Sequence, residues 1–400
     1  MKKLYTTLVM LAFFGLSTNA QWQQTSLDSG QVSCFAISGN YIFAGSGIYN
    51  DGEVYLSSTN GSSWAALSNG LPLTNNVVST LIIKGDTIFA GTQSGIYLSS
   101  NNGTSWTAAN TGLTDAYSNV YAVWSLAIKG NIIYAGTYGG GLYFSSNNGS
   151  SWTAINMGLT NAYIHNLAIN NNNIFAGVGG HGVYLSSNNG TSWQPVNNGL
   201  TDSIDIEAIA INGNNIFVGT GDGVFLSSNN GGSWDSVNTG LTNKGINALV
   251  NNGNKIFAGT NSGVFMSSNN GSSWNLVSSG LEYSYVRAIA INGNYIFAGT
   301  YGNGVYRLPL SETGIEKINN NTSNIAVYPN PAIKSITIDV SATLNMQATI
   351  EISNIQGQLI KTFATTGNKT SVDVSSFPSG VYVLEVKTEK TVEMSKFVKE

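Results

Sequence analysis

Between residues 21 and 310, short apolar runs alternate with turns that are rich in Gly, Asn and Ser. The text at 208–241, AIAINGNNIFVGTGDGVFLSSNNGGSWDSVNTGL, shows one complete unit of this pattern. Its runs span 206–211, 215–219 and 223–227, and a fourth begins at Ser233. Short β-branched and aromatic runs bounded by Gly, Asn or Ser are typical of strands. The pattern therefore predicts four short strands in each unit.

The unit recurs with a nearly constant period. The stretch SSNNGTSW, or a close copy of it, ends at tryptophans 64, 106, 152, 193, 234 and 274, which are 42, 46, 41, 41 and 40 residues apart. Trp22 lies 42 residues before Trp64 and belongs to the same series. Four strands in a repeat of about 40 residues are typical of a β-propeller blade.

The two ends of the repeat predict how the ring closes. The first-strand motif begins near Val32, Val78, Val123, Ile164, Ile206, Ile246 and Val286, which makes seven copies. The chain opens with a fourth strand, QWQQTSL, and the last repeat stops after a third, GVYRLPL. Two incomplete ends that sum to one blade predict an all-β, seven-bladed propeller over 21–310 in which the N-terminal strand closes the last blade.

The repeated stretch joins the third strand of a unit to the fourth. Asn102 and Gly103 suit the positive φ of a tight hairpin, and Ser99 and Asn101 can hydrogen-bond the local backbone. The large ring of Trp106 is expected to pack between blades. Because the stretch is shared by all units, we assign a structural role to its tryptophans, which are Trp22, Trp64, Trp106, Trp152, Trp193, Trp234 and Trp274.

This stretch resembles the Asp-box, S-x-D-x-G-x-[ST]-[WF], a hairpin found in sialidases, sortilin-type receptors, xyloglucan-cleaving glycosidases and photosystem II assembly factors. The resemblance covers each unit from about 21 to 310 and implies a propeller of the BNR-repeat kind. The Asp position departs from the family pattern, because it holds Thr59, Asn101, Asn147, Asn188, Asn229 and Asn269. The bearers of the box differ so much that the resemblance does not identify a function.

The two ends of the chain differ from the repeating part. Residues 1–20 have a basic start at Lys2 and Lys3, a short apolar stretch and small residues before a cut, which is typical of a signal peptide; a membrane anchor is the alternative. A polar linker is expected at 311–324 and a small, Ig-like antiparallel sandwich at 325–400.

The tail resembles the C-terminal sorting domain of the type IX (Por) secretion system of Bacteroidota. The matching pieces are Tyr328-Pro329-Asn330-Pro331, Gly357-Gln358-Leu359, Gly380-Val381-Tyr382 and Lys396-Phe397-Val398-Lys399. The resemblance implies recognition by the type IX machinery, passage across the outer membrane, removal of the domain, and release or attachment at the cell surface. An ordinary Ig-like module is the alternative.

Composition narrows the function further. The formal net charge of −4 leaves no basic footprint for nucleic acid, and the single cysteine, Cys34, cannot form an intramolecular disulfide. Only two arginines, Arg287 and Arg307, are present. A sialidase needs three arginines to hold the substrate carboxylate, so the sequence argues against sialidase activity. No metal motif, phosphate loop or serine-nucleophile elbow occurs, so we expect no metal and no cofactor.

The candidate site consists of equivalent positions at which the units carry different residues. One equivalent position in the seven first strands reads Ser33, Ser79, Trp124, His165, Glu207, Asn247 and Arg287. The loops after the second strands vary in the same way. Aromatic rings with scattered polar groups suit sugar or peptide recognition. The candidate ligand-binding residues are Trp124, His165, Glu207 and Arg287 from the strands, and Tyr138, His181, Asp222 and Tyr301 from the loops.

Three functions stay open at this point. The first is a secreted or cell-surface propeller without catalysis that binds a glycan or a protein. The second is a glycoside hydrolase that uses Asp202, Asp205 or Glu207, since such enzymes need two carboxylates about 5–10 Å apart. The third is a rigid surface spacer, in which Trp124 fills a gap between blades because strand alternation places it on the same face as Leu126.

Overall fold

The computed structural model describes residues 21–47, 52–72, 77–201, 204–282, 284–313, 325–340, 348–354, 358–365, 368–387 and 392–400. The signal peptide predicted at 1–20, most of the linker predicted at 311–324, and Asp202 lie outside the described residues. The chain divides into two compact units, Met1–Ile315 and Glu316–Glu400.

The first unit is built from antiparallel sheets of short strands, as the alternation of apolar runs and Gly/Asn turns predicts. Five of its sheets have four strands each, hydrogen-bonded in chain order. These sheets are β6 (Val78–Lys84), β7 (Thr87–Thr92), β8 (Gly95–Ser99) and β9 (Thr107–Ala108); β10 (Val123–Lys129), β11 (Ile132–Thr137), β12 (Leu142–Ser145) and β13 (Thr153–Ala154); β14 (Ile164–Asn170), β15 (Asn173–Val178), β16 (Gly182–Ser186) and β17 (Gln194–Pro195); β18 (Ala208–Asn212), β19 (Asn215–Thr220), β20 (Gly223–Ser227) and β21 (Asp235–Ser236); and β22 (Ile246–Asn252), β23 (Lys255–Thr260), β24 (Gly263–Ser267) and β25 (Asn275–Leu276).

The remaining strands of this unit form the place where the chain closes on itself. They are β1 (Gln23–Gln24), β2 (Gly30–Ser38), β3 (Tyr41–Ser46), β4 (Val54–Ser57), β5 (Ala65–Ala66), β26 (Val286–Asn292), β27 (Tyr295–Gly302) and β28 (Val305–Pro309). Strand β1 pairs with β28, and β2 pairs with β27 through Gly30↔Gly302 and Gln31↔Tyr301. The first strand, β1, is therefore the outer neighbour of β28, the last strand of this unit.

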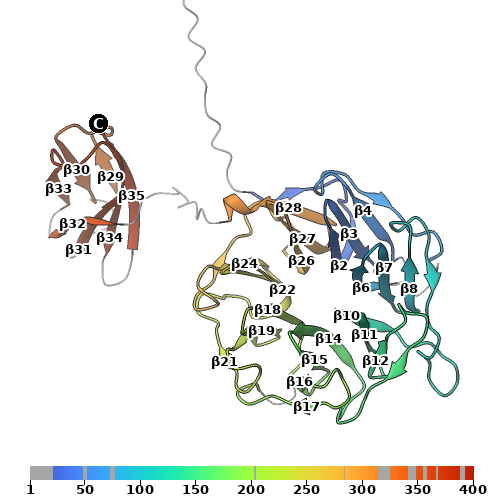
Figure 1. Cartoon of the computed structure of the whole chain (residues 1–400). Helices are drawn as coiled ribbons and strands as arrows, with labels where there is room; N and C mark the ends of the chain where they lie inside the picture. Colours follow the sequence, from blue (N-terminus) through green and yellow to red (C-terminus); the bar gives the residue numbers. More distant parts are fainter. Residues whose placement is uncertain are drawn as a thin grey trace, which may run out of the picture. The chain divides into compact units, whose positions relative to one another are not determined.

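The sheets are arranged around a common axis. The first strands of the units, β2, β6, β10, β14, β18, β22 and β26, lie nearest the centre, and the later strands of each unit lie outward of them (Figure 1). This is the arrangement of a β-propeller, and the predicted all-β propeller is confirmed. Within the described residues the only helix is the 3₁₀ turn η1 (Leu310–Glu312). No helix among them is both long and apolar enough to cross a membrane.

A glycine on the second strand of each unit allows the next unit to pack closely. A Cβ built on Gly91 would lie 2.6 Å from Cγ2 of Thr80 and 2.8 Å from Cγ1 of Val123, which begins the next unit. The same relation joins the last unit to the first, because a Cβ on Gly299 would lie 2.7 Å from Cγ1 of Val32. The close packing of neighbouring units thus continues across the closure.

We expect Gly91→Ala to destabilise the propeller by about 1–3 kcal/mol, because the added methyl group overpacks the contact between two units. Thermal unfolding of the purified variant measures the loss. Gly221→Ala is the matched control, because a Cβ there meets no atom within 4 Å and its φ is not in the left-handed region. Equal melting temperatures for the two variants would contradict the packing argument.

The repeated SSNNGTSW stretch forms a loop that bonds to itself. Ser99 Oγ donates to Asn101 Oδ1 over 2.8 Å and accepts the backbone N–H of Gly103 over 2.9 Å. Asn102 has φ 55° and Gly103 has φ 85°, the conformation that Asn and Gly adopt most readily. The side chains of Ser99 and Asn101 are thus used within the loop.

The tryptophan after each loop connects neighbouring units. The indole N–H of Trp106 donates to the carbonyl oxygen of Leu67 in the preceding unit over 2.7 Å. Equivalent bonds are made by Trp22, Trp152, Trp193, Trp234 and Trp274. Trp64 differs: it is less buried, and its N–H donates to Thr25 Oγ1 in the N-terminal segment.

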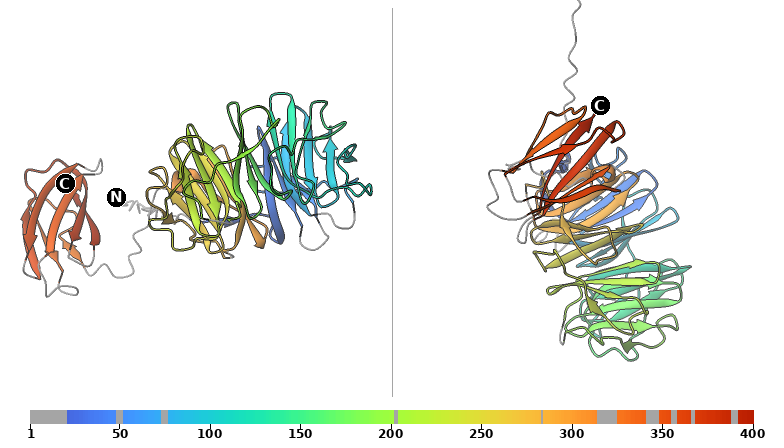
Figure 2. Two further views of the ribbon diagram at one scale, coloured as in Figure 1. Left: turned by 90° about the horizontal axis from the view of Figure 1, so that it is seen from below. Right: turned by 90° about the vertical axis from the view of Figure 1, so that its left-hand side faces the viewer.

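The second unit has two antiparallel sheets and a core of its own. One sheet has the order β29-β30-β33 and the other β32-β31-β34-β35. The strands are β29 (Ala326–Tyr328), β30 (Ser335–Asp339), β31 (Ala348–Asn354), β32 (Leu359–Thr365), β33 (Lys369–Asp373), β34 (Gly380–Lys387) and β35 (Val392–Lys399). Ile336, Ile352 and Phe397 are fully buried in one apolar cluster of this unit, whose strands are coloured orange to red in Figure 2.

Candidate functional site

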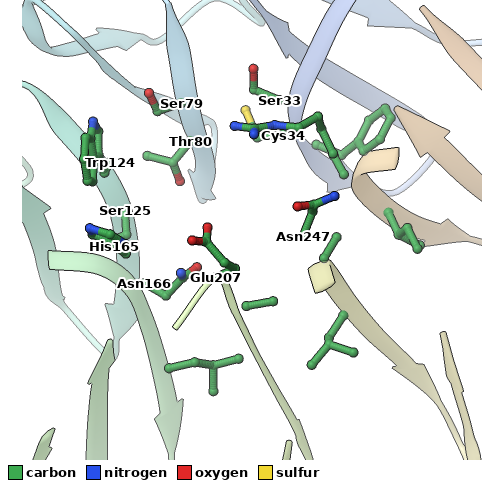
Figure 3. A pocket seen from close by; sticks show the side chains of 18 of the residues that line it. Ser33, Cys34, Ser79, Thr80, Trp124, Ser125, His165, Asn166, Glu207 and Asn247 are labelled. Atoms are coloured by element: carbon green, nitrogen blue, oxygen red, sulfur yellow. The ribbon is translucent and has the colours of Figure 1, made fainter. Parts of the chain in front are cut away.

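A central cavity of about 560 Å³ opens where the innermost strands converge. All seven residues at the non-repeating position line it: Ser33, Ser79, Trp124, His165, Glu207, Asn247 and Arg287. In Figure 3 the labelled members of this set surround one space, and the Glu207 carboxylate reaches into it. The cavity thus collects the variable side chain of every unit.

A β-bulge places most of these side chains at the cavity. In β2, Val32 pairs with Ser46 and Cys34 pairs with Gly45, so Ser33 between them has no partner in the ladder. The residues skipped in this way are Ser33, Ser79, Trp124, His165, Asn247 and Arg287. Bulges re-aim side chains and are frequent beside functional sites.

The bulge changes what strand alternation predicts for Trp124. Strict alternation places Trp124 on the face of the buried Leu126, which favours a packing role. The register shift between Val123 and Ser125 interrupts the alternation, and Trp124, Ser125 and Leu126 all line the cavity. Trp124 is partly exposed, whereas the box tryptophan Trp106 is 4% exposed.

Four aromatic rings form a continuous series on one side of the cavity. The ring centroid of Trp124 lies 4.7 Å from that of His165 and 4.6 Å from that of Tyr138. Tyr138 in turn lies 4.6 Å from Tyr163. Tyr138 is 49% exposed and Tyr163 38%, so the series runs from the cavity to the open rim.

Sequence reasoning missed Tyr163, although the signal for it was present. Tyr163 stands directly before the first apolar residue of its inner strand, and the equivalent residues are Gln31, Val77, Ala122, Tyr163, Asp205, Gly245 and Tyr285. This second position varies between units as much as the one that was noticed. Gln31 and Val77 line the central cavity.

Polar groups without partners lie in the cavity wall. The hydroxyl oxygens of Ser33 and Ser125 are buried, and neither has a hydrogen-bond partner. Ser125 is 7% exposed. A buried hydroxyl without a partner carries a desolvation cost of about 1–3 kcal/mol, and both oxygens lie beneath the cavity surface.

The one thiol in the cavity wall is not set up as a nucleophile. Burial raises the pKa of Cys34 to about 12, and only the hydrogen bond with the backbone of Gly45 acts in the opposite direction. A thiol with this pKa carries almost no thiolate at neutral pH, and the thiolate is the reactive form.

A second hollow of about 430 Å³ adjoins the central cavity over the fifth to seventh units. Its carboxylates come from Asp205, Glu207 and Asp222, and its wall includes Tyr285. Glu207, Asn247 and Arg287 line both hollows. In the part of the chain that the structure describes, the Glu207 carboxylate and the Arg287 guanidinium make no hydrogen bond or ion pair, so both are available to a ligand.

The structure assembles most of the residues that the sequence singled out. Tyr138 contacts Trp124, Asp222 lies in the second hollow, and Tyr301 packs against Tyr285 with ring centroids 5.3 Å apart. His181 is exposed and lines neither hollow. Among the described residues no group of three or more His, Cys, Asp or Glu side chains could hold a metal ion.

The chain matches two protein families, which together cover residues 17–284 and 326–400. Residues 17–164 and 159–284 match the family described as "DUF6242 beta propeller domain". Residues 326–400 match the "Secretion system C-terminal sorting domain", which confirms the sorting domain predicted from the tail. No curated protein sequence matches the chain.

Solved propellers resemble the chain in fold at low sequence identity. One is PorZ, "an essential bacterial surface component of the type-IX secretion system" of Porphyromonas gingivalis, with 17% identity and a TM-score of 0.59 over 92% of this chain. YCF48 bound to D1 peptide has 14% identity and a TM-score of 0.57, over 74% of this chain and 98% of that one. A GH74 xyloglucanase from Xanthomonas campestris has 16% identity and a TM-score of 0.57 over 73% of this chain. The chain spans 59% of the length of PorZ and 54% of that of the xyloglucanase.

Proposed function

Because the chain belongs to the DUF6242 β-propeller family and ends in a type IX sorting domain, we propose that it is an exported binding protein whose ligand occupies the central cavity. The sorting domain makes it a secreted or cell-surface protein. Its partners are then the type IX machinery, through residues 325–400, and a glycan or protein ligand at the propeller.

One observation carries the binding proposal. The units are nearly identical where they pack on each other, yet the seven residues at the non-repeating position, which all line one cavity, are of six different types, with only serine occurring twice. Packing alone does not require this diversity, since Ser33 and Ser79 fill the position in two units. A volume of about 560 Å³ is within the usual range of small-molecule sites.

The proposal includes a domain plan. Residues 1–20 are the signal peptide, 21–310 a seven-bladed propeller, 311–324 the linker, and 325–400 an Ig-like sorting domain that is removed after export. The closure of β1 on β28 and the repeating sheets support the blade number. The internally bonded loops support the view that the Asp-box-like hairpins, with their tryptophans, serve the fold alone.

A glycoside hydrolase is the second candidate, and one observation favours it. Asp205 and Glu207 lie two residues apart in the chain, Asp222 comes from the next loop of the same unit, and all three line the same hollow. Glycosidases use two carboxylates on opposite sides of the bond that is cleaved. One arrangement argues against Asp205 in this role, because its Oδ1 already accepts the backbone N–H of Gly180 over 2.7 Å.

An array of glycans and peptides, probed with the mature chain, separates the candidates. Binding without product release supports the binding protein, whereas release of sugar supports the hydrolase. If neither binding nor release occurs, the propeller is a rigid surface spacer.

We expect Glu207→Gln and Trp124→Ala each to weaken ligand capture by about 1–3 kcal/mol, because both remove a side chain that faces the cavity. Binding isotherms measure the loss, and thermal melts of the same proteins test the fold. Glu282→Gln is the matched control, since Glu282 is exposed and lines neither hollow. A lower melting temperature with unchanged affinity would show that the two residues only pack.

A further inference from the structure

The aromatic series and the two hollows lie on one continuous path across the propeller. Tyr163 and Tyr138 form its open end at the rim, and Trp124 carries it into the central cavity. The cavity then adjoins the second hollow, because Glu207 and Arg287 belong to the walls of both. A ligand on this path would pass from the third and fourth units to the fifth and seventh.

The chemistry of the path changes along its length. At the rim, the side chains of Tyr138 and Tyr163 are 49% and 38% exposed, so part of each apolar ring is open to solvent. In the cavity, Trp124 is followed directly in the chain by Ser125, whose enclosed hydroxyl has no partner. At the far wall stand an unpaired carboxylate and an unpaired guanidinium, those of Glu207 and Arg287.

This combination suits a carbohydrate. A sugar ring presents a C–H face that packs on an aromatic ring and hydroxyl groups at its edge that both donate and accept hydrogen bonds. Glu207 can accept hydrogen bonds from such hydroxyl groups, and Arg287 can donate to them.

We infer that the ligand is a linear saccharide chain of several units, which lies along this path with successive sugar rings on Tyr163, Tyr138 and Trp124 and continues past Glu207 and Arg287 into the second hollow. The inference rests on the proposed binding function and specifies its ligand class. A single sugar would occupy only the cavity and would leave the rim tyrosines unused.

The test is the dependence of affinity on chain length. The mature chain is probed with β-1,4-, β-1,3- and α-1,4-linked gluco-, manno- and xylo-oligosaccharides of one to six units, and binding is measured by calorimetry for every series that an array detects. We expect affinity to rise about tenfold or more from the shortest bound member to the longest, since each added ring gains an aromatic contact. An affinity that does not change with length would overturn the inference.

Two tyrosine variants test whether the rim of the path causes the gain in affinity with chain length. We expect Tyr138→Ala to remove most of the chain-length effect, with about a fivefold to tenfold loss for the longest members and no change for the shortest. Tyr41→Ala is the matched control: Tyr41 is 44% exposed, begins β3 at the end of the hairpin remote from the bulge, and lines neither hollow. Melting curves confirm that both variants fold.

The possible failures are distinguishable. Capture of peptides alone, lost in Glu207→Gln, would overturn the saccharide assignment and leave the proposed binding function standing. Saccharide binding that Tyr138→Ala and Tyr41→Ala affect equally would overturn the path. Absence of any ligand on the array would overturn both.

Discussion

Deletion of residues 21–27 is expected to lower the free energy of unfolding by at least about 3–5 kcal/mol, the usual cost of losing one buried tryptophan. Trp22 is 3% exposed, and its indole N–H donates to the Val277 carbonyl oxygen over 2.6 Å. The deletion also removes β1 (Gln23–Gln24) and leaves the outer edge of β28 without its partner. A loss of this size is a large share of the stability of a typical domain.

The same segment also holds the first unit. Thr25 Oγ1 accepts the indole N–H of Trp64, and Ser26 Oγ accepts the backbone N–H of the same residue. Residues 21–27 therefore connect the first and last units of the chain through both side chain and backbone. The effect of the deletion should exceed that of Trp22→Ala, because Trp22→Ala leaves these bonds in place.

Chemical denaturation of the intact and shortened proteins measures the difference. Gln23→Ala is the control, since Gln23 is exposed and the substitution keeps the backbone pairing of β1. If the shortened chain has the same free energy of unfolding as the intact one, closure by the N-terminal strand is wrong.

Removal of residues 325–400 is expected to abolish delivery to the cell surface and to leave the protein in the periplasm. The match to the sorting domain covers 326–400, and this part of the chain has its own buried core. The tail-less propeller should keep its melting temperature, because the two units have separate cores. The deletion then changes where the protein is delivered and not whether it folds.

Cell fractionation with antibodies to the propeller measures this effect. As a control, residues 325–400 placed behind an exported reporter should carry it to the surface in the same host. Surface delivery of the tail-less chain would falsify the sorting assignment.

Local patterns in the sequence were enough for the repeating part of the structure. Strand periodicity, Asn-Gly turns and a constant spacing of tryptophans each depend on neighbouring residues, so they predict strands, hairpins and propeller without knowledge of long-range contacts. The pairing of the first strand with the last also followed from the repeat, because two incomplete ends must complement each other. The tail was identified from residues within one segment.

The site could be predicted only in part, because it depends on how strands about 40 residues apart meet. The variable position marked Trp124, His165, Glu207 and Arg287, and all four line one cavity. Variation alone also selected His181, which lines neither hollow, since exposed loops vary whether or not they bind anything.

The sequence by itself thus determined the strand pattern, the repeating packing residues and the export tail, since each is written in residues that are close together in the chain. Only the tertiary structure decided the rest. A β-bulge, which no alternation pattern reveals, brought both Trp124 and its sequence neighbour Ser125 into the cavity wall. Contact between separate units joined Tyr163 to Tyr138 and made Glu207 and Arg287 the common wall of two hollows, because side chains from distant strands meet only when the ring is closed.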